Sequence, residues 1–144
     1  MSAKVKLHHI AMSVNDLEES VAWYEEMFGM KVVRNMTIEH TGSKIAFVAN
    51  EDFVIEMLQV PGSAPNPKER NHPDTDNAVQ GFKHYCITVE NNKEFIKGLV
   101  EKGVKIVFEF QPGGEESYCA FINDPTGNVI EIFDDRNRVA DKIS

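Results

Sequence analysis

The sequence predicts an α+β fold made of two modules, each with a strand, a helix and then three more strands. The first indication is a repeat, since His9 and His84 are 75 residues apart and so are Glu56 and Glu131. The second is that strand-like and helix-like patterns follow one another in the same order in both halves. A length of 144 residues suits one domain. We therefore expect a single domain over 1–144, with module one at about 5–60, a linker at about 61–81 and module two at about 82–134.

The first module opens with a β-type run from Leu7 to Val14. Asp16, followed three residues later by Glu19, has the spacing of a capping box, with Asp in place of Ser or Thr. Apolar residues then recur at helical intervals until Gly29, a residue type that commonly ends helices. The β-leaning runs that follow are Lys31 to Val33, Ile45 to Ala49 and Phe53 to Leu58.

The second module repeats these signals in the same order. A β-type run from His84 to Val89 is followed by Asn91 as the expected helix cap and by Gly103 as the expected stop. The two stop glycines are only 74 residues apart, so a slip of one residue has to be made good before Glu131. At the 75-residue offset Phe47 matches Ile122. The β-leaning runs are Lys105 to Glu109, Tyr118 to Ile122 and Asn128 to Phe133.

The composition argues against several classes of function. With 15 Lys and Arg against 23 Asp and Glu, the formal charge is −8, so nucleic acids and anionic membrane surfaces would be repelled. No apolar run has the length of a signal-peptide core or of a membrane span, and we expect a cytoplasmic protein. In that reducing compartment Cys86 and Cys119 are expected to be free thiols that fill space in strands.

The repeated His and Glu residues form the candidate site. Glu56 and Glu131 each lie between apolar neighbours on a strand, where a carboxylate is costly to bury unless something compensates its charge. Two carboxylates and two imidazoles that converged would bind a divalent cation and leave open positions for water or substrate. His8 is the neighbour of His9, but strand alternation predicts that its side chain points to the opposite face.

These residues resemble the vicinal oxygen chelate superfamily, which includes glyoxalases, bleomycin resistance proteins and extradiol dioxygenases. The pattern from His9 to Leu17, with Trp23-Tyr24 and Phe28-Gly29 after it, resembles the opening module of that superfamily. The run from Asp124 to Glu131 is similar to its closing strand. The segments Ile55 to Leu58 and Phe82 to His84 fall where its other two metal strands lie.

The resemblance implies paired βαβββ modules whose mixed sheets curl around a metal site, and short members of the superfamily commonly form homodimers. It implies that His9, Glu56, His84 and Glu131 are the metal ligands and that Glu131 or Glu56 is the catalytic base, with Glu131 favoured. The set is similar to that of bacterial glyoxalase I of the nickel or cobalt type. There the metal holds both oxygens of an α-hydroxycarbonyl compound and stabilises the enediolate left when a carboxylate removes the carbon-bound proton.

The function implied is a glyoxalase-like lyase, isomerase or epimerase that acts on a small molecule and uses one divalent ion per site, nickel, cobalt, zinc or manganese. Glyoxalases that use glutathione carry an arginine just before the valine of the first strand, and here that place is Ser13. The resemblance therefore does not extend to the residue that holds glutathione. Two alternatives stay open: an iron-dependent extradiol ring-cleaving dioxygenase, for which Glu56 would be an extra ligand, and a non-catalytic antibiotic-binding protein.

Overall fold

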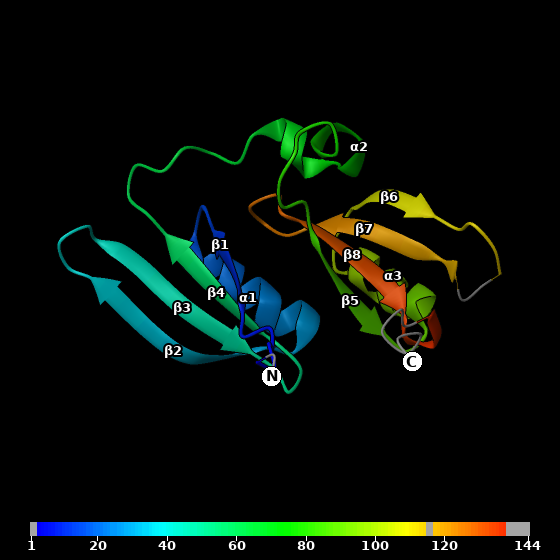
Figure 1. Ribbon diagram of the computed structural model, residues 1–144, viewed down its shortest axis with the longest axis horizontal. Helices are drawn as coiled ribbons and strands as arrows, with labels where there is room; N and C mark the ends of the chain where they lie inside the picture. Colours follow the sequence, from blue (N-terminus) through cyan, green and yellow to red (C-terminus); the bar gives the residue numbers. More distant parts are fainter. Residues whose placement is uncertain (1–2, 115–116, 138–144) are drawn as a thin grey trace. The chain divides into compact units, whose positions relative to one another are not determined.

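The computed structural model describes residues 3–114 and 117–137, which fall into two compact units, Met1–Pro65 and Asn66–Ser144. Each unit contains one four-stranded mixed sheet and one long helix (Figure 1). In both sheets the first and last strands of the module pair in parallel, and the other pairs are antiparallel. This architecture confirms the predicted α+β fold of two βαβββ modules.

The elements of the first unit follow the predicted order, and its sheet has the strand order β1-β4-β3-β2. They are β1 (Ile10–Ser13), α1 (Leu17–Phe28), β2 (Lys31–Ile38), β3 (Ser43–Ala49) and β4 (Val54–Gln59).

The second unit repeats this order after a helical connection, and its sheet has the strand order β5-β8-β7-β6. Its elements are η1 (Lys68–Asn71), α2 (Pro73–Asp76), β5 (Tyr85–Val89), α3 (Asn92–Glu101), β6 (Ile106–Phe110), β7 (Cys119–Asn123), β8 (Val129–Asp134) and η3 (Asp135–Asn137).

One face of each sheet packs against the long helix of its unit and carries the hydrophobic core. Because side chains alternate along a strand, the residues between the core positions point to the other face. Glu56 and Glu131 are such residues, and both lie between fully buried isoleucine or methionine neighbours. The core side chains from the central strands are Ala46, Val48, Ile55 and Met57 in the first unit, and Ala120, Ile122, Ile130 and Ile132 in the second.

The two helices occupy the same place in their modules but begin differently. As predicted, Asp16 caps α1, and its side chain accepts a hydrogen bond from the Glu19 backbone N–H. Asn91 precedes α3 in a left-handed conformation (φ 53°) and makes no side-chain cap, so the predicted second capping box is not formed. The first backbone N–H of α3, that of Asn92, instead donates to the buried Asp134 carboxylate at 3.4 Å.

The one-residue slip in the repeat is made good in the turn before the last strand. The β3–β4 turn has four residues between its strands and the β7–β8 turn has five. In that longer turn the Asp124 side chain accepts hydrogen bonds from the backbone N–H groups of Thr126 and Asn128. From the end of the first helix to this turn, equivalent residues of the two modules are therefore 74 positions apart in the sequence. The structural counterpart of Phe47 is Phe121, not Ile122.

The segment that the sequence predicts as a linker is partly structured, and from Asn66 onward it belongs to the second unit. Within this segment the buried side chain of Asp76 contacts two cations. Its Oδ1 accepts a hydrogen bond from Nζ of Lys83 at 3.2 Å and lies 3.6 Å from Nε of Arg70. Among the described residues no helix is both long and apolar enough to cross a membrane.

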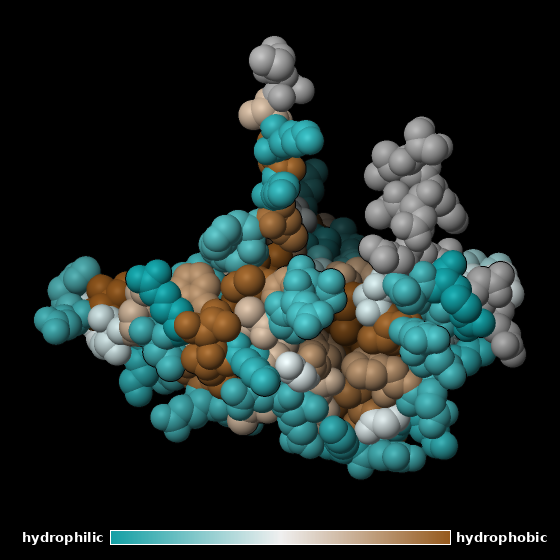
Figure 2. Space-filling model, turned by 90° about the horizontal axis from the view of Figure 1, so that it is seen from below, coloured by the Kyte–Doolittle hydropathy of each residue, from teal (hydrophilic) through white to brown (hydrophobic). Residues whose placement is uncertain are grey.

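The N-terminal strand is shorter than predicted, because pairing with β4 begins only at Ile10. The residues before it extend away from the body of their module, and Figure 2 shows hydrophobic and hydrophilic residues alternating along this segment. Val5 and Leu7 are 92% and 80% exposed, so the alternating pattern here does not mark a buried strand.

Candidate metal centre

Each module brings one predicted histidine against one predicted glutamate. In the first unit, His9 directly precedes β1 and its Nε2 lies 3.1 Å from Oε2 of Glu56 on β4. In the second unit, His84 directly precedes β5, and its Nε2 lies 2.8 Å from Oε2 of Glu131 on β8. The contact follows from the parallel pairing of the first and last strands, which puts Ala11 beside Glu56 and Cys86 beside Glu131. The two pairs are thus equivalent in position and in the atoms that meet.

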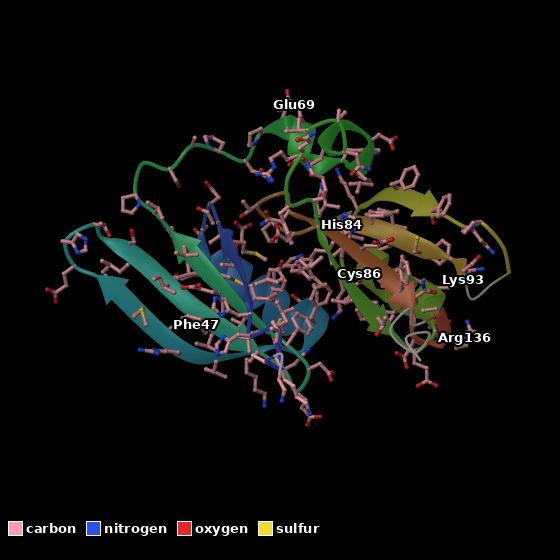
Figure 3. All side chains as sticks on the ribbon, in the orientation of Figure 1. Phe47, Glu69, His84, Cys86, Lys93 and Arg136 are labelled. Atoms are coloured by element: carbon pink, nitrogen blue, oxygen red, sulfur yellow. The ribbon has the colours of Figure 1, made fainter. Side chains whose placement is uncertain are left out.

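A phenylalanine packs edge-on against each imidazole. Phe47 on β3 is the cross-strand partner of Glu56, and its ring centroid lies 5.8 Å from that of His9. Phe121 on β7 is the partner of Glu131, with its centroid 5.2 Å from that of His84. Figure 3 labels Phe47 on its strand and His84 at the start of β5. The 75-residue comparison misses this correspondence because of the one-residue slip.

The carboxylates are partly shielded from solvent on this face. The Glu56 side chain is 20% exposed and that of Glu131 is 16% exposed, while the histidines are 32% and 27% exposed. Partial burial strengthens the attraction of each carboxylate for a cation, since less water competes for the charge. Every pair still keeps some access from solvent.

The surroundings of Glu131 differ from those of Glu56. Cys86 is exposed and Cys119 is buried, so only the second fills core space as predicted. Desolvation and the nearby Glu131 carboxylate raise the pKa of Cys86 to about 12 and that of Cys119 to about 11. Both cysteines are therefore neutral thiols near pH 7, and neither is poised as a nucleophile.

His8 does not point away from His9 as strand alternation predicts. Its Nδ1 lies 2.7 Å from Nδ1 of His9, and the two rings meet edge to face. The reason is that both residues precede the first paired residue of β1, so the alternation of an extended strand does not govern them. Pattern reasoning missed this contact because it placed both residues inside a strand.

The donor set fits a divalent cation. Metal–ligand bonds of about 2.1 Å place two donors at right angles on an octahedral ion about 3.0 Å apart. The two Nε2 to Oε2 distances, 3.1 and 2.8 Å, are close to that separation. No cluster of three or more potential ligands occurs within residues 3–114 and 117–137, so each module by itself offers two. The described structure therefore shows two pairs of one imidazole nitrogen and one carboxylate each, and we call each pair a half-site.

Fold and half-sites together define a class of protein in which a βαβββ module is duplicated and each copy presents one His–Glu pair. The family model "Glyoxalase/Bleomycin resistance protein/Dioxygenase superfamily" matches residues 6–132. The chain belongs to this superfamily.

Known proteins of similar sequence or fold agree with this assignment. The lactoylglutathione lyase of Salmonella typhimurium is 28% identical over 135 residues, which cover 90% of this chain and 93% of the relative. The trypanothione-dependent glyoxalase I of Leishmania major has a similar fold, with a TM-score of 0.75, 22% identity and coverage of 96% of this chain and 93% of that one. FosX of Listeria monocytogenes, a fosfomycin resistance protein solved with Mn(II), has a TM-score of 0.71 at 14% identity, and the match covers 99% and 100% of the two chains.

Some relatives are much longer than this chain. Against the putative lactoylglutathione lyase of Brassica oleracea var. gemmifera, the chain is 26% identical over 134 residues, which cover 90% of this chain but only 44% of the relative. At 26% and 28% identity, the relation to these lactoylglutathione lyases is a distant one.

Proposed function

We propose that this protein is a divalent-metal-dependent lyase, isomerase or epimerase that removes a proton next to a carbonyl group of a small molecule. The observation that carries the proposal is the duplicated His–Glu contact, at 3.1 Å in one module and 2.8 Å in the other. Packing does not require an ionisable pair at the same place in both sheets. A shared cation explains why both pairs are present.

In this proposal one complete site takes its four ligands from two half-sites. The Nε2 atoms of His9 and His84 and carboxylate oxygens of Glu56 and Glu131 would hold the ion. A bound divalent cation would supply the positive charge that stabilises the anion formed beside the carbonyl group. Nickel, cobalt, zinc or manganese suits this nitrogen and oxygen set.

The proton would be taken by one of the two glutamates. Each carboxylate lies close to the Nε2 atom of a histidine, at 2.8 Å for Glu131 and 3.1 Å for Glu56. This contact therefore does not distinguish which of the two is the base. The resemblance to glyoxalases favours Glu131 as the base. Ser13, where glutathione-dependent glyoxalases carry an arginine, supports a substrate other than a glutathione adduct.

We further expect a homodimer in the cytoplasm. The homodimer is expected from the resemblance, since short members of the superfamily commonly dimerise. The cytoplasmic location stays a prediction from the sequence.

Metal content tests the proposed ligands. After loading with Ni²⁺, Co²⁺, Zn²⁺ or Mn²⁺ and desalting, mass spectrometry of the metal should give one ion per complete site in the wild type. His84→Ala and Glu131→Ala should each lose most of it, because removing one ligand of a pair leaves an incomplete donor set. His40→Ala, which removes an exposed histidine from the β2–β3 turn, should retain it. An unchanged number of bound metal ions per protein in both His84→Ala and Glu131→Ala would show that the ligand assignment is wrong.

Proton transfer tests the reaction class. Loaded protein in deuterated water should exchange the carbon-bound proton of small α-hydroxycarbonyl compounds, including thiol adducts of methylglyoxal made with and without glutathione. Glu131→Gln should abolish the exchange while Glu56→Gln leaves part of it, if Glu131 is the base. Tightly held ferrous iron with oxygen uptake on catechols would instead overturn the proposed reaction class in favour of ring cleavage. A protein that binds no metal at all would favour the non-catalytic alternative.

A further inference from the structure

The two half-sites differ in what contacts the far side of the histidine ring. His9 has a second imidazole against its Nδ1, with 2.7 Å between its own Nδ1 and that of His8. The position equivalent to His8 in the second module is Lys83, whose Nζ is held 3.2 Å from Oδ1 of Asp76 and donates to its backbone carbonyl at 2.8 Å. Within the described residues, the hydrogen-bond, ion-pair and ring contacts of the His84 side chain are with Glu131 and Phe121.

The short contact between the two Nδ1 atoms requires one hydrogen between them. Either His8 donates to His9 or His9 donates to His8, since a neutral imidazole carries its hydrogen on one nitrogen and accepts on the other. If His8 donates, neutral His9 carries its own hydrogen on Nε2, the atom that lies 3.1 Å from Oε2 of Glu56. If His9 donates, its Nε2 lone pair is free.

The second arrangement is the one that a metal ligand needs. A histidine that binds through Nε2 keeps its hydrogen on Nδ1, and a hydrogen-bond acceptor at that nitrogen fixes both the tautomer and the orientation of the ring. From these contacts we infer that His8 is a positioning residue for His9, which holds it in the Nδ1–H tautomer when a cation is bound at Nε2. The inference rests on the proposed metal site.

His8 suits this role because an imidazole can both donate and accept at the same nitrogen. It satisfies His9 before the ion binds, as a donor, and afterwards, as an acceptor, with no change in the net charge of the two rings. A phenylalanine at position 8 would keep the ring shape and lose both functions. An asparagine would restore them, since its amide oxygen and nitrogen lie about as far from the backbone as the imidazole Nδ1.

Zinc binding to three variants tests the role. The protein labelled with ¹⁵N is titrated with Zn²⁺, and long-range ¹H–¹⁵N spectra report which nitrogen of His9 carries hydrogen and which carries zinc. Affinity is measured in parallel by competition with a chromophoric chelator. In the wild type and in His8→Asn, His9 should bind zinc through Nε2 with hydrogen on Nδ1. In His8→Phe the affinity should fall about 10-fold, the lower end of the effect of losing such a partner.

His40→Phe is the matched control, because it makes the same replacement at an exposed histidine in the β2–β3 turn. It should bind zinc as the wild type does. Equal affinity and identical His9 signals in wild type and His8→Phe would overturn the role of His8 while leaving the metal site intact. If zinc leaves the His9 signals of the wild type unchanged, the proposed metal site itself is contradicted.

Discussion

At the scale of single residues, Asp134 is a buried carboxylate of the second module that is held by charged and backbone donors. Its side chain is fully buried and accepts from Nε of Arg136 at 2.7 Å, from Nη2 of the same residue at 2.8 Å and from the Asn92 backbone. The Arg136 guanidinium, with help from the backbone N–H groups of Arg136 and Asn92, holds the pKa of the Asp134 carboxyl well below its usual range. A folded-state pKa below the unfolded one means that the charged form stabilises the fold.

Replacing Asp134 with Asn should therefore destabilise the protein in a pH-dependent way. At pH 7 the free energy of unfolding should fall by about 1–3 kcal/mol, because charge-assisted hydrogen bonds are lost. The contribution of Asp134 is fully present above its unfolded pKa of about 3.9 and declines as the pH falls toward the folded-state pKa. The gap between wild type and variant should thus narrow below about pH 4. Urea unfolding from pH 7 to 3 measures it, with the exposed Asp52→Asn as the control. A gap independent of pH would contradict the assignment.

At the scale of elements, α1 and α3 occupy the same place in the two modules but have differently stabilised N-termini. The first uses a local cap, Asp16, while the second begins after a left-handed Asn91 and is tied to the last strand through Asp134. A local cap depends on a neighbour in sequence, whereas the second device depends on a residue 42 positions away. The start of α3 is therefore decided by tertiary structure.

Opposite outcomes are expected when the two residues are changed. Asp16→Ala should lower the free energy of unfolding by about 1 kcal/mol, since the Glu19 N–H loses its acceptor. Asn91→Gly should leave it unchanged or raise it by about 0.5 kcal/mol, because glycine adopts a positive φ at little cost. Urea midpoints followed by circular dichroism distinguish the two. An equal loss in both variants would show that Asn91 caps α3 after all.

At the scale of the whole molecule, two half-sites would have to come together to form one four-ligand metal site. Each module holds one complete His–Glu pair and only two of the four predicted ligands. The proposed four-ligand site would therefore need either the two modules of one chain or one module from each of two chains. The second arrangement would make the proposed active unit a dimer.

Complementation between two inactive variants distinguishes these arrangements. His9→Ala with Glu56→Ala disables the first module, and His84→Ala with Glu131→Ala disables the second. After the two proteins are mixed, unfolded and refolded, sites built between chains should regain about one quarter of the wild-type metal content. The reason is that random pairing of equal amounts makes half of the dimers contain one copy of each variant. In each of these dimers one of the two sites has all four ligands, so about one quarter of all sites is intact. Sites built within one chain should regain none. Metal analysis and sedimentation of the mixture provide both readouts.

The sequence alone was sufficient for the architecture and for the equivalent positions of the candidate ligands in the two modules. The equal spacing of His9 with His84 and of Glu56 with Glu131 predicted two equivalent modules, and local signals such as Asp16 and Gly29 predicted where α1 begins and ends. These features could be predicted because duplication, strand alternation and helix capping depend on residues that lie close together in the sequence or recur at one interval.

Only the tertiary structure showed that Phe121 rather than Ile122 is the counterpart of Phe47 and that His8 contacts His9. Both depend on where strand pairing begins and on a turn that is one residue longer in the second module. A shift of one residue moves a side chain to the other face of a sheet, and hydrogen bonding between strands, which a single sequence does not display, decides that register.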